Sequence, residues 1–219
     1  MFYLALGYSD TYMPFLTLIA FHFFRRQIRK EESGFIYFIT INFLIFAATN
    51  VLFFFSINNL LLYHFYYLFE LVFVTGYITK QLLRIPHFLF YAIVTLYTFF
   101  WASAFFSPGP LELFNNYAAI LEKAVIMLIS IYYIIICLRK GAGLRQSVYN
   151  PGFFIAAGFL LSSAFGLISV SAYQYYLRSG YPGADINAWV FESIGTILKF
   201  TFIITGFLCY KFHRRYPYH

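Results

Sequence analysis

Long apolar stretches, separated by short polar breaks, dominate the chain. Each stretch holds about twenty residues, which is the length that an α-helix needs to cross the hydrocarbon core of a bilayer. A membrane β-barrel would instead show alternating segments of about ten residues. The pattern predicts an all-α integral membrane protein, a single seven-transmembrane-helix bundle. The predicted spans are approximately residues 4–24, 35–55, 60–79, 88–106, 113–138, 153–177 and 188–210.

The breaks between the predicted spans carry residues that end helices. Residues 31–34, 107–110 and 179–183 are rich in Ser, Pro and Gly, with two Glu in the first break. Asn150 followed by Pro151 places a capping side chain and then a helix-compatible proline before the sixth span. These features predict where the helices begin and end.

The composition supports a bilayer environment. Of the 219 residues, 62% are hydrophobic and 11% are charged, whereas a soluble domain carries roughly 25% charged residues. The 31 Phe and 21 Tyr suit lipid contact and the membrane interfaces. The net charge of +7 lies in short loops, where it sets topology, and no nucleic-acid-reading element accompanies it. We therefore expect the lipid bilayer as a partner and no nucleic acid.

Basic residues lie mainly in every second break between the predicted spans, and this distribution predicts how the protein is oriented in the membrane. Arg178 is the one basic residue that the spans place on the other side. The positive-inside rule makes the basic side cytoplasmic, so the N-terminus is expected outside and the C-terminus in the cytoplasm. The first apolar run precedes its basic cluster, which indicates an uncleaved first helix. The basic side comprises Arg25, Arg26, Arg29, Lys30, Lys80, Arg84, Arg139, Lys140, Arg145, Lys211, Arg214 and Arg215.

Several ionisable and polar residues fall inside the predicted spans. A charge near the bilayer centre costs about 2.5–3.5 kcal/mol on insertion scales, so each is a candidate functional residue. Most lie between the midplane and the outer surface; Glu70, for example, lies roughly 15 Å below the outer end of its span. We expect a ligand-binding site or a proton relay formed by Asp10, Asn50, Tyr63, His64, Tyr66, Tyr67, Glu70, Glu122, Glu192 and Lys199.

Helical spacing assigns these residues to shared faces. Residues seven apart return to nearly the same direction, so Glu192 and Lys199 form one polar stripe, and Tyr63 and Glu70 form another. Spans three, five and seven are expected to turn such stripes toward a common interior, with a central Glu70–Lys199 ion pair. Gly158, Ser162 and Gly166, spaced by four, predict a small-residue groove for close helix packing.

Structural roles are open alternatives for the same residues. The Glu70–Lys199 pair can lock the bundle, as can Glu122 with Lys123, or Lys123 can snorkel along its helix. His64 fits a hydrogen-bonded structural histidine, and the tyrosines also suit packing. Asn42 and Asn50 fit hydrogen bonds between helices.

Catalytic motifs are absent from the sequence. It contains no spacing for a hydrolytic zinc site, no Gly-x-Ser-x-Gly elbow and no phosphate loop. A membrane enzyme that uses Glu70 as acid or base is a lesser alternative, and the sequence leaves any cofactor unknown. Lys199 with Glu70 is similar to the lysine and counter-ion of retinal-binding rhodopsins, but Gly195 replaces the Asp that the microbial type places four residues before its lysine.

Three segments carry a resemblance to a group of known proteins. Residues 59–70 (Asn-Leu-Leu-Leu-Tyr-His-Phe-Tyr-Tyr-Leu-Phe-Glu), 150–154 (Asn-Pro-Gly-Phe-Phe) and 197–200 (Ile-Leu-Lys-Phe) resemble uncharacterised bacterial seven-helix inner-membrane proteins. The resemblance implies a multi-pass protein of the bacterial inner (cytoplasmic) membrane and carries no known activity.

Two functions fit these observations best. The first is a sensor or receptor subunit that binds a small-molecule ligand in an outward-facing polar and aromatic cavity and signals to a separate cytoplasmic protein. The second is a small-solute or proton-coupled transporter that uses the intramembrane carboxylates Glu70, Glu122 and Glu192. A membrane enzyme and a retinal-binding protein are the lesser alternatives.

Overall fold

A computed structural model describes residues 8–26, 28, 34–106, 116–140, 150–179 and 184–215 of the chain. Within these residues the protein is all-α, with seven α-helices, of which α4 continues into a short π-helix, η2. The elements are α2 (Ser9–Phe24), α3 (Gly34–Phe54), α4 (Leu60–Gly76), η2 (Tyr77–Leu82), α5 (His87–Phe106), α6 (Asn116–Lys140), α8 (Pro151–Ser179) and α9 (Ala184–Arg215).

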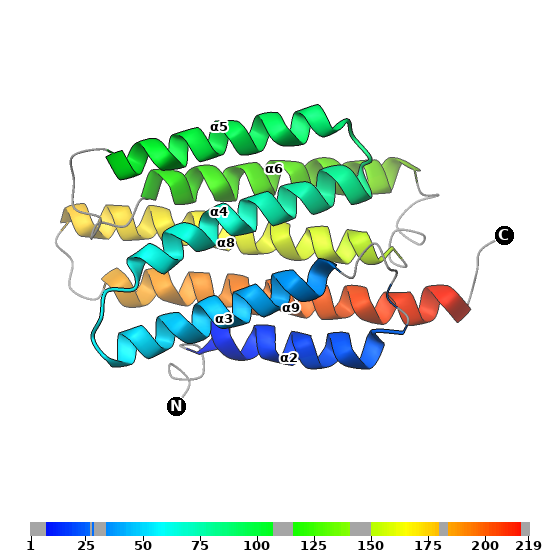
Figure 1. Cartoon of the computed structure of the whole chain (residues 1–219), viewed down its shortest axis with the longest axis horizontal. Helices are drawn as coiled ribbons and strands as arrows, with labels where there is room; N and C mark the ends of the chain where they lie inside the picture. The colour runs from blue at the N-terminus through cyan, green and yellow to red at the C-terminus, as the bar shows by residue number, and fades with distance from the viewer. Residues whose placement is uncertain are drawn as a thin grey trace.

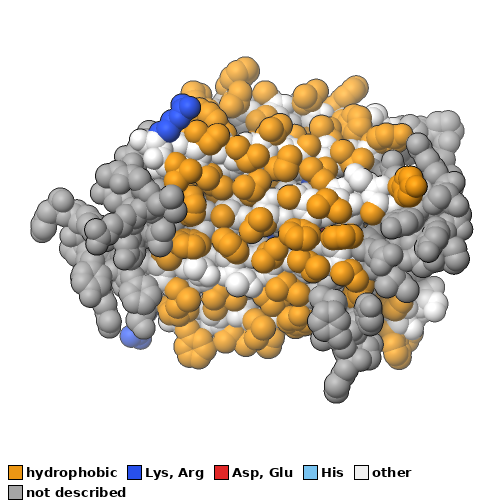
Figure 2. All heavy atoms as spheres, turned by 180° about the vertical axis from the view of Figure 1, so that it is seen from behind, with side chains coloured by type: hydrophobic (Ala, Val, Ile, Leu, Met, Phe, Trp, Pro, Cys, Tyr) orange, Lys and Arg blue, Asp and Glu red, His pale blue; other side chains and the backbone are white. Residues whose placement is uncertain are grey.

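Among the residues that the structure describes, five helical stretches are long and apolar enough to cross a membrane. They are Gly34–Phe54, Leu61–Lys80, Tyr117–Arg139, Pro151–Ala172 and Trp189–Cys209. The apolar part of α5, His87–Ser103, is shorter, and α2 has 16 residues. Figure 2 shows hydrophobic side chains covering the middle of one face of the molecule, with Lys and Arg at one end. By helix composition the protein is a multi-pass membrane protein.

The predicted spans agree with the observed helices to within a few residues at most ends. The starts of the first and fifth predicted spans, 4–7 and 113–115, lie outside the described residues. The last helix runs beyond its predicted span 188–210 at both ends, because polar residues continue the helix past the apolar segment. The Asn150 side chain accepts a hydrogen bond from the Gly152 backbone N–H at 3.0 Å, which confirms the predicted cap of α8.

The π-helix at the end of α4 was not predicted from the sequence. In η2 the Leu83 N–H donates to the Ile78 carbonyl at 2.9 Å, a bond across five residues. The Lys80 ammonium lies 3.9 Å from the centre of the Phe90 ring, which ties this wider turn to α5. Because the apolar pattern is the same on either side, hydrophobicity alone carries no signal of the extra residue per turn.

Six helices form a closed ring. Consecutive helices run in opposite directions along the bundle (Figure 1), and packing contacts connect α2, α3, α4, α6, α8, α9 and then α2 again. Helix α5 packs outside the ring against α4 and α6. The interior is therefore bounded by helices far apart in the sequence.

The ring interior has an aromatic half. The Phe38 ring lies 4.5 Å from Phe73 of α4 and 5.6 Å from Phe159 of α8, measured between ring centres. The Phe35 ring contacts Phe207 of α9 at 6.3 Å in the same way. We call these five residues the aromatic layer. The aromatic layer fills the interior of the helical ring between Glu70 and the end of the bundle at which α4 passes into η2. Its residues come from four helices, α3, α4, α8 and α9.

Helices α8 and α9 pack closely through glycines. A Cβ atom added at Gly158 would lie 2.9 Å from the Lys199 carbonyl oxygen, and one added at Gly195 would lie 3.2 Å from the Ser162 carbonyl oxygen. The predicted small-residue groove is therefore present at Gly158 and Ser162. Gly166, the third member of the pattern, instead faces the side chain of Lys123 on α6.

Candidate functional site: a buried charge cluster

Glu70 of α4 lies at the centre of a buried group of charges. The Lys199 ammonium of α9 donates to Glu70 Oε1 at 2.7 Å and to the Tyr66 hydroxyl oxygen at 2.8 Å. Both members of the ion pair have side chains only 2% exposed. The predicted Glu70–Lys199 ion pair is therefore present, and charge-assisted bonds of this kind are the strong ones.

A second lysine binds the other oxygen of the same carboxylate. The Lys123 ammonium of α6 donates to Glu70 Oε2 at 2.9 Å. Glu70 therefore joins α4 to both α6 and α9, and we call Glu70, Glu122, Lys123 and Lys199 the charge cluster. The sequence interpretation left Lys123 out of the candidate site, because its sequence neighbour Glu122 offered a simpler partner.

The missed contact had one signal in the sequence. The stem of Lys123 lies across Gly166 of α8, whose added Cβ would meet Lys123 Cε at 3.0 Å. A glycine therefore gives the long side chain its path into the ring interior. That relation depends on how α6 and α8 are rotated, which spacing alone does not give.

Glu122 is the least satisfied member of the charge cluster. Its side chain is fully buried, and the Lys123 ammonium lies 3.3 Å from Glu122 Oε2 as an ion pair. Among the described residues, neither Glu122 oxygen accepts a hydrogen bond of good geometry. A carboxylate in this condition is costly to keep charged in an apolar medium, so it is suited to gain and lose a proton.

Tyrosine rings cover the charge cluster on the α4 side. The Lys199 ammonium lies 5.5 Å from the centre of the Tyr66 ring, and the Lys123 ammonium lies 5.3 Å from that of Tyr67. Tyr63, one turn earlier, packs edge-on against Phe46 of α3 at 6.2 Å. The Tyr67 ring attracts the Lys123 ammonium, whereas the Lys199 ammonium lies at the hydroxyl edge of Tyr66 and is held by its hydrogen bond to that oxygen.

Asp10 lies in the first turn of α2, and Glu192 lies more than two turns into α9. The Asp10 side chain is buried at the start of α2, with a hydrogen bond to the Thr196 side chain of α9. Glu192 is half-buried, one turn before Thr196. The structure thus brings seven predicted residues to one side of the ring interior, together with the unpredicted Lys123: Asp10, Tyr66, Tyr67, Glu70, Glu122, Glu192 and Lys199.

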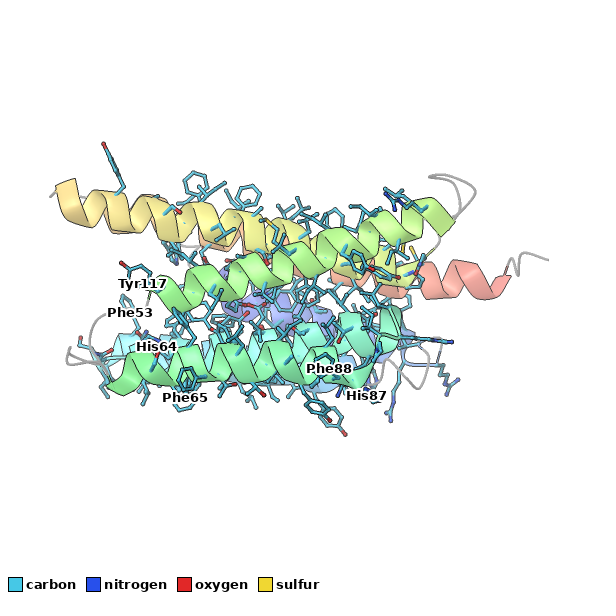
Figure 3. All side chains as sticks on the ribbon, turned by 90° about the horizontal axis from the view of Figure 1, so that it is seen from above. Phe53, His64, Phe65, His87, Phe88 and Tyr117 are labelled. Carbon is cyan, nitrogen blue, oxygen red and sulfur yellow. The ribbon has the colours of Figure 1, made fainter. Side chains whose placement is uncertain are left out.

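Asn50 and His64 have contacts of a different kind. Asn50 of α3 donates to the Thr11 hydroxyl of α2 at 2.6 Å, the expected bond between helices. His64 is buried near the same end as Phe53 and Tyr117, and its backbone carbonyl accepts a bond from the Trp101 indole N–H at 3.0 Å (Figure 3). Asn42 was expected to bond between helices, but its amide donates to the Phe38 carbonyl of its own helix at 2.8 Å.

Metal binding and known relatives give no further assignment. Within the described ranges, no group of three or more His, Cys, Asp or Glu side chains could hold a metal ion. Comparison with protein-family models, curated proteins and solved structures finds no match. The resemblance to bacterial inner-membrane proteins therefore identifies no family.

Proposed function

We propose that the chain is a sensor or receptor subunit that binds a small ligand from outside the cell and signals to a separate cytoplasmic protein. The observation that carries this proposal is Glu70, which holds lysines from two other helices at 2.9 and 2.7 Å. One carboxylate joins three helices through its ion pairs, so a ligand that altered these pairs would act on all three helices. A change there alters α4, α6 and α9 together.

The proposal includes seven membrane crossings with the N-terminus outside. One end of the helical ring is basic. At this end α2 and η2 finish and α3 begins, and its basic residues are Arg25, Arg26, Lys80 and Arg84, with Arg139 at the same end of α6. The positive-inside rule assigns that end to the cytoplasm. The charge cluster then lies between the midplane and the outer surface. The bacterial inner membrane, implied by sequence resemblance, is part of the same proposal.

The aromatic layer fills the interior of the helical ring, which favours a sensor over a protein with a continuous solute path across the membrane. Phe38, Phe73 and Phe159 interlock across the ring on the proposed cytoplasmic side of the charge cluster. A ligand that entered from outside would meet the charge cluster and stop above these rings. Its preference for one arrangement of the lysine-bearing helices would shift the bundle between two states.

The first test is mild cross-linking in native membranes, followed by purification and mass spectrometry for associated proteins and retained small molecules. We expect a stoichiometric cytoplasmic signalling protein. A retained molecule should raise the unfolding temperature of the wild-type protein and not that of Lys199→Met, in which Glu70 keeps Lys123 as a partner. Equal stabilisation of both proteins would exclude Lys199 from the site, and a preparation without any partner would count against signalling.

A proton-coupled transporter is the second candidate, and Glu122 is the observation that favours it. Its buried carboxylate has no well-aligned donor among the described residues, and it neighbours the Glu70 ion pairs. A relay should lose proton flux in liposomes in Glu122→Gln, while Glu70 keeps both lysines and the fold. Unchanged flux in that variant, or no flux in the wild-type protein, would exclude the relay.

A further inference from the structure

Two positive charges lie at the basic end of the bundle, at the corner where η2 ends and α5 begins. Lys80 belongs to η2 and is half-buried, whereas Arg84 is exposed in the short link between η2 and α5. Within the part of the chain that the structure describes, no carboxylate forms an ion pair with either side chain. No described group of the protein therefore neutralises this corner.

Two aromatic rings of α5 fix the position of the Lys80 ammonium. It lies 3.9 Å from the centre of the Phe90 ring and 4.8 Å from that of Tyr91. The two ring centres are 5.2 Å apart, so both rings lie on the same side of the ammonium. An ammonium carries three N–H donors. The side of Lys80 away from the rings can therefore donate to an anion.

Arg84 has a backbone conformation that favours glycine. Its φ angle is 53°, and the Ile85 N–H donates to the Thr79 carbonyl at 2.9 Å, which closes the helix end around it. Glycine is the usual residue at such a left-handed position, because a side chain makes this conformation costly. The chain nevertheless places a guanidinium here, and the fork of a guanidinium matches two oxygens of a phosphate.

Both cations lie beside the beginning of α5. Arg84 precedes His87, the first residue of α5, by three positions, so their Cα atoms lie within about 11 Å of each other. The Lys80 ammonium lies over Phe90, one turn into α5. The N-terminus of a helix also favours negative charge. The corner therefore attracts an anion from three directions.

The surface of α5 next to this corner is apolar. Helix α5 packs outside the ring, and its first two turns leave Phe88 76% exposed and Tyr91 58% exposed. Figure 2 shows Lys and Arg side chains at one end of a surface covered by hydrophobic side chains. A molecule with a negative headgroup and apolar tails matches both parts of this surface, whereas a soluble anion matches only the basic part.

We propose that Lys80 and Arg84 bind the phosphate of an anionic phospholipid, whose acyl chains lie along the exposed Phe88 and Tyr91 side chains of α5. Basic pockets between membrane helices bind anionic headgroups in this way. Under the proposed orientation, the lipid belongs to the cytoplasmic leaflet. The inference goes beyond the proposed function, because the lipid site is the same in a sensor and in a transporter.

The test measures phosphatidylglycerol binding to the full chain by native mass spectrometry, after purification in detergent. Phosphatidylcholine with the same acyl chains is the neutral lipid control, and sn-glycerol 3-phosphate is the soluble phosphate control. We expect phosphatidylglycerol to bind about tenfold or more tightly than either control. Lys80→Met and Arg84→Gly should each weaken its binding about fivefold, which is the contribution of one basic residue near an anionic surface.

Arg84→Gly separates lipid binding from folding. Glycine adopts the left-handed conformation readily, so this variant should unfold at the same temperature as the wild-type protein, or higher, in phosphatidylcholine nanodiscs. The matched control is Arg25→Gln/Arg26→Gln, which removes two exposed positive charges at the end of α2, across the ring from α5 (Figure 1). Its affinity for phosphatidylglycerol should stay within about twofold of the wild-type value.

Four results would overturn the lipid site. Equal binding of phosphatidylcholine would remove the role of charge, and equal binding of glycerol phosphate would assign the corner to a soluble anion. A loss in Arg25→Gln/Arg26→Gln as large as that in Lys80→Met/Arg84→Gly would show attraction to the whole basic end. Unchanged affinity in Lys80→Met/Arg84→Gly would place the lipid elsewhere.

Discussion

Glu70 determines the electrostatic balance of the bundle, because each of its oxygens binds a different lysine. The ring interior screens charges poorly, so the pairs are strong when complete and costly when broken. The pair with Lys199 could be predicted from the depth of both residues in their spans. The pair with Lys123 could not, since it requires the rotation of α6 relative to α4 and α8.

The first prediction concerns the loss of this carboxylate. Glu70→Gln should lower the free energy of unfolding by about 3–5 kcal/mol, because it leaves the buried Lys199 ammonium without its counter-ion and Lys123 with only the 3.3 Å pair to Glu122. Unfolding by heat or by increasing SDS in mixed micelles measures the change. The matched control is the triple variant Glu70→Gln/Lys123→Met/Lys199→Met, which removes the charges with their partner.

We expect the triple variant to regain most of the lost stability, because apolar side chains of similar length replace the lysines. A triple variant no more stable than Glu70→Gln would contradict an electrostatic origin. The destabilisation would then come from the shape of the glutamate side chain.

At the scale of the elements, the apolar runs predicted the helices well because the bilayer requires about twenty apolar residues for each crossing. They carried no information on two features. One is η2, whose extra residue per turn leaves the hydrophobic pattern unchanged. The other is the order of helices around the ring, which depends on side-chain fit between elements distant in sequence. Local signals for this order come only from the small residues of α8, with Gly158 and Ser162 toward α9 and Gly166 toward α6.

The second prediction tests that contact with three glycines. A Cβ at Gly158 would meet the Lys199 backbone carbonyl at 2.9 Å, and backbone atoms yield poorly, so Gly158→Ala should cost about 1–3 kcal/mol. A Cβ at Gly166 would meet the flexible Lys123 side chain at 3.0 Å, so Gly166→Ala should cost less. Thermal unfolding in nanodiscs provides the comparison.

Gly34 provides the matched control for the substitution itself. A Cβ there would meet no atom within 4 Å, so Gly34→Ala should leave the unfolding temperature nearly unchanged. If Gly158→Ala behaved like Gly34→Ala, the two helices would be more loosely packed than the structure indicates.

At the scale of the whole molecule, the proposed function depends on which end of the ring faces outward. The two ends differ in charge, and the charge cluster and the aromatic layer occupy opposite sides of the interior. If the orientation were reversed, the charge cluster would lie toward the cytoplasm and an external ligand would meet the aromatic layer. The orientation is therefore the assumption whose test bears on every functional proposal.

The last prediction tests this orientation with single cysteines at the two ends of the α4–η2 segment. Cys137 and Cys209, the two cysteines of the chain, are first replaced by alanine. Exposed positions then carry the label, Ile57→Cys before α4 and His87→Cys after η2. In spheroplasts a membrane-impermeant maleimide should label Ile57→Cys, whereas His87→Cys should react only after permeabilisation, because the basic end faces the cytoplasm. The reverse pattern would place the charge cluster toward the cytoplasm and reject an external ligand. Labelling of both cysteines in intact spheroplasts would mean that α4 does not cross the bilayer, in conflict with its apolar length.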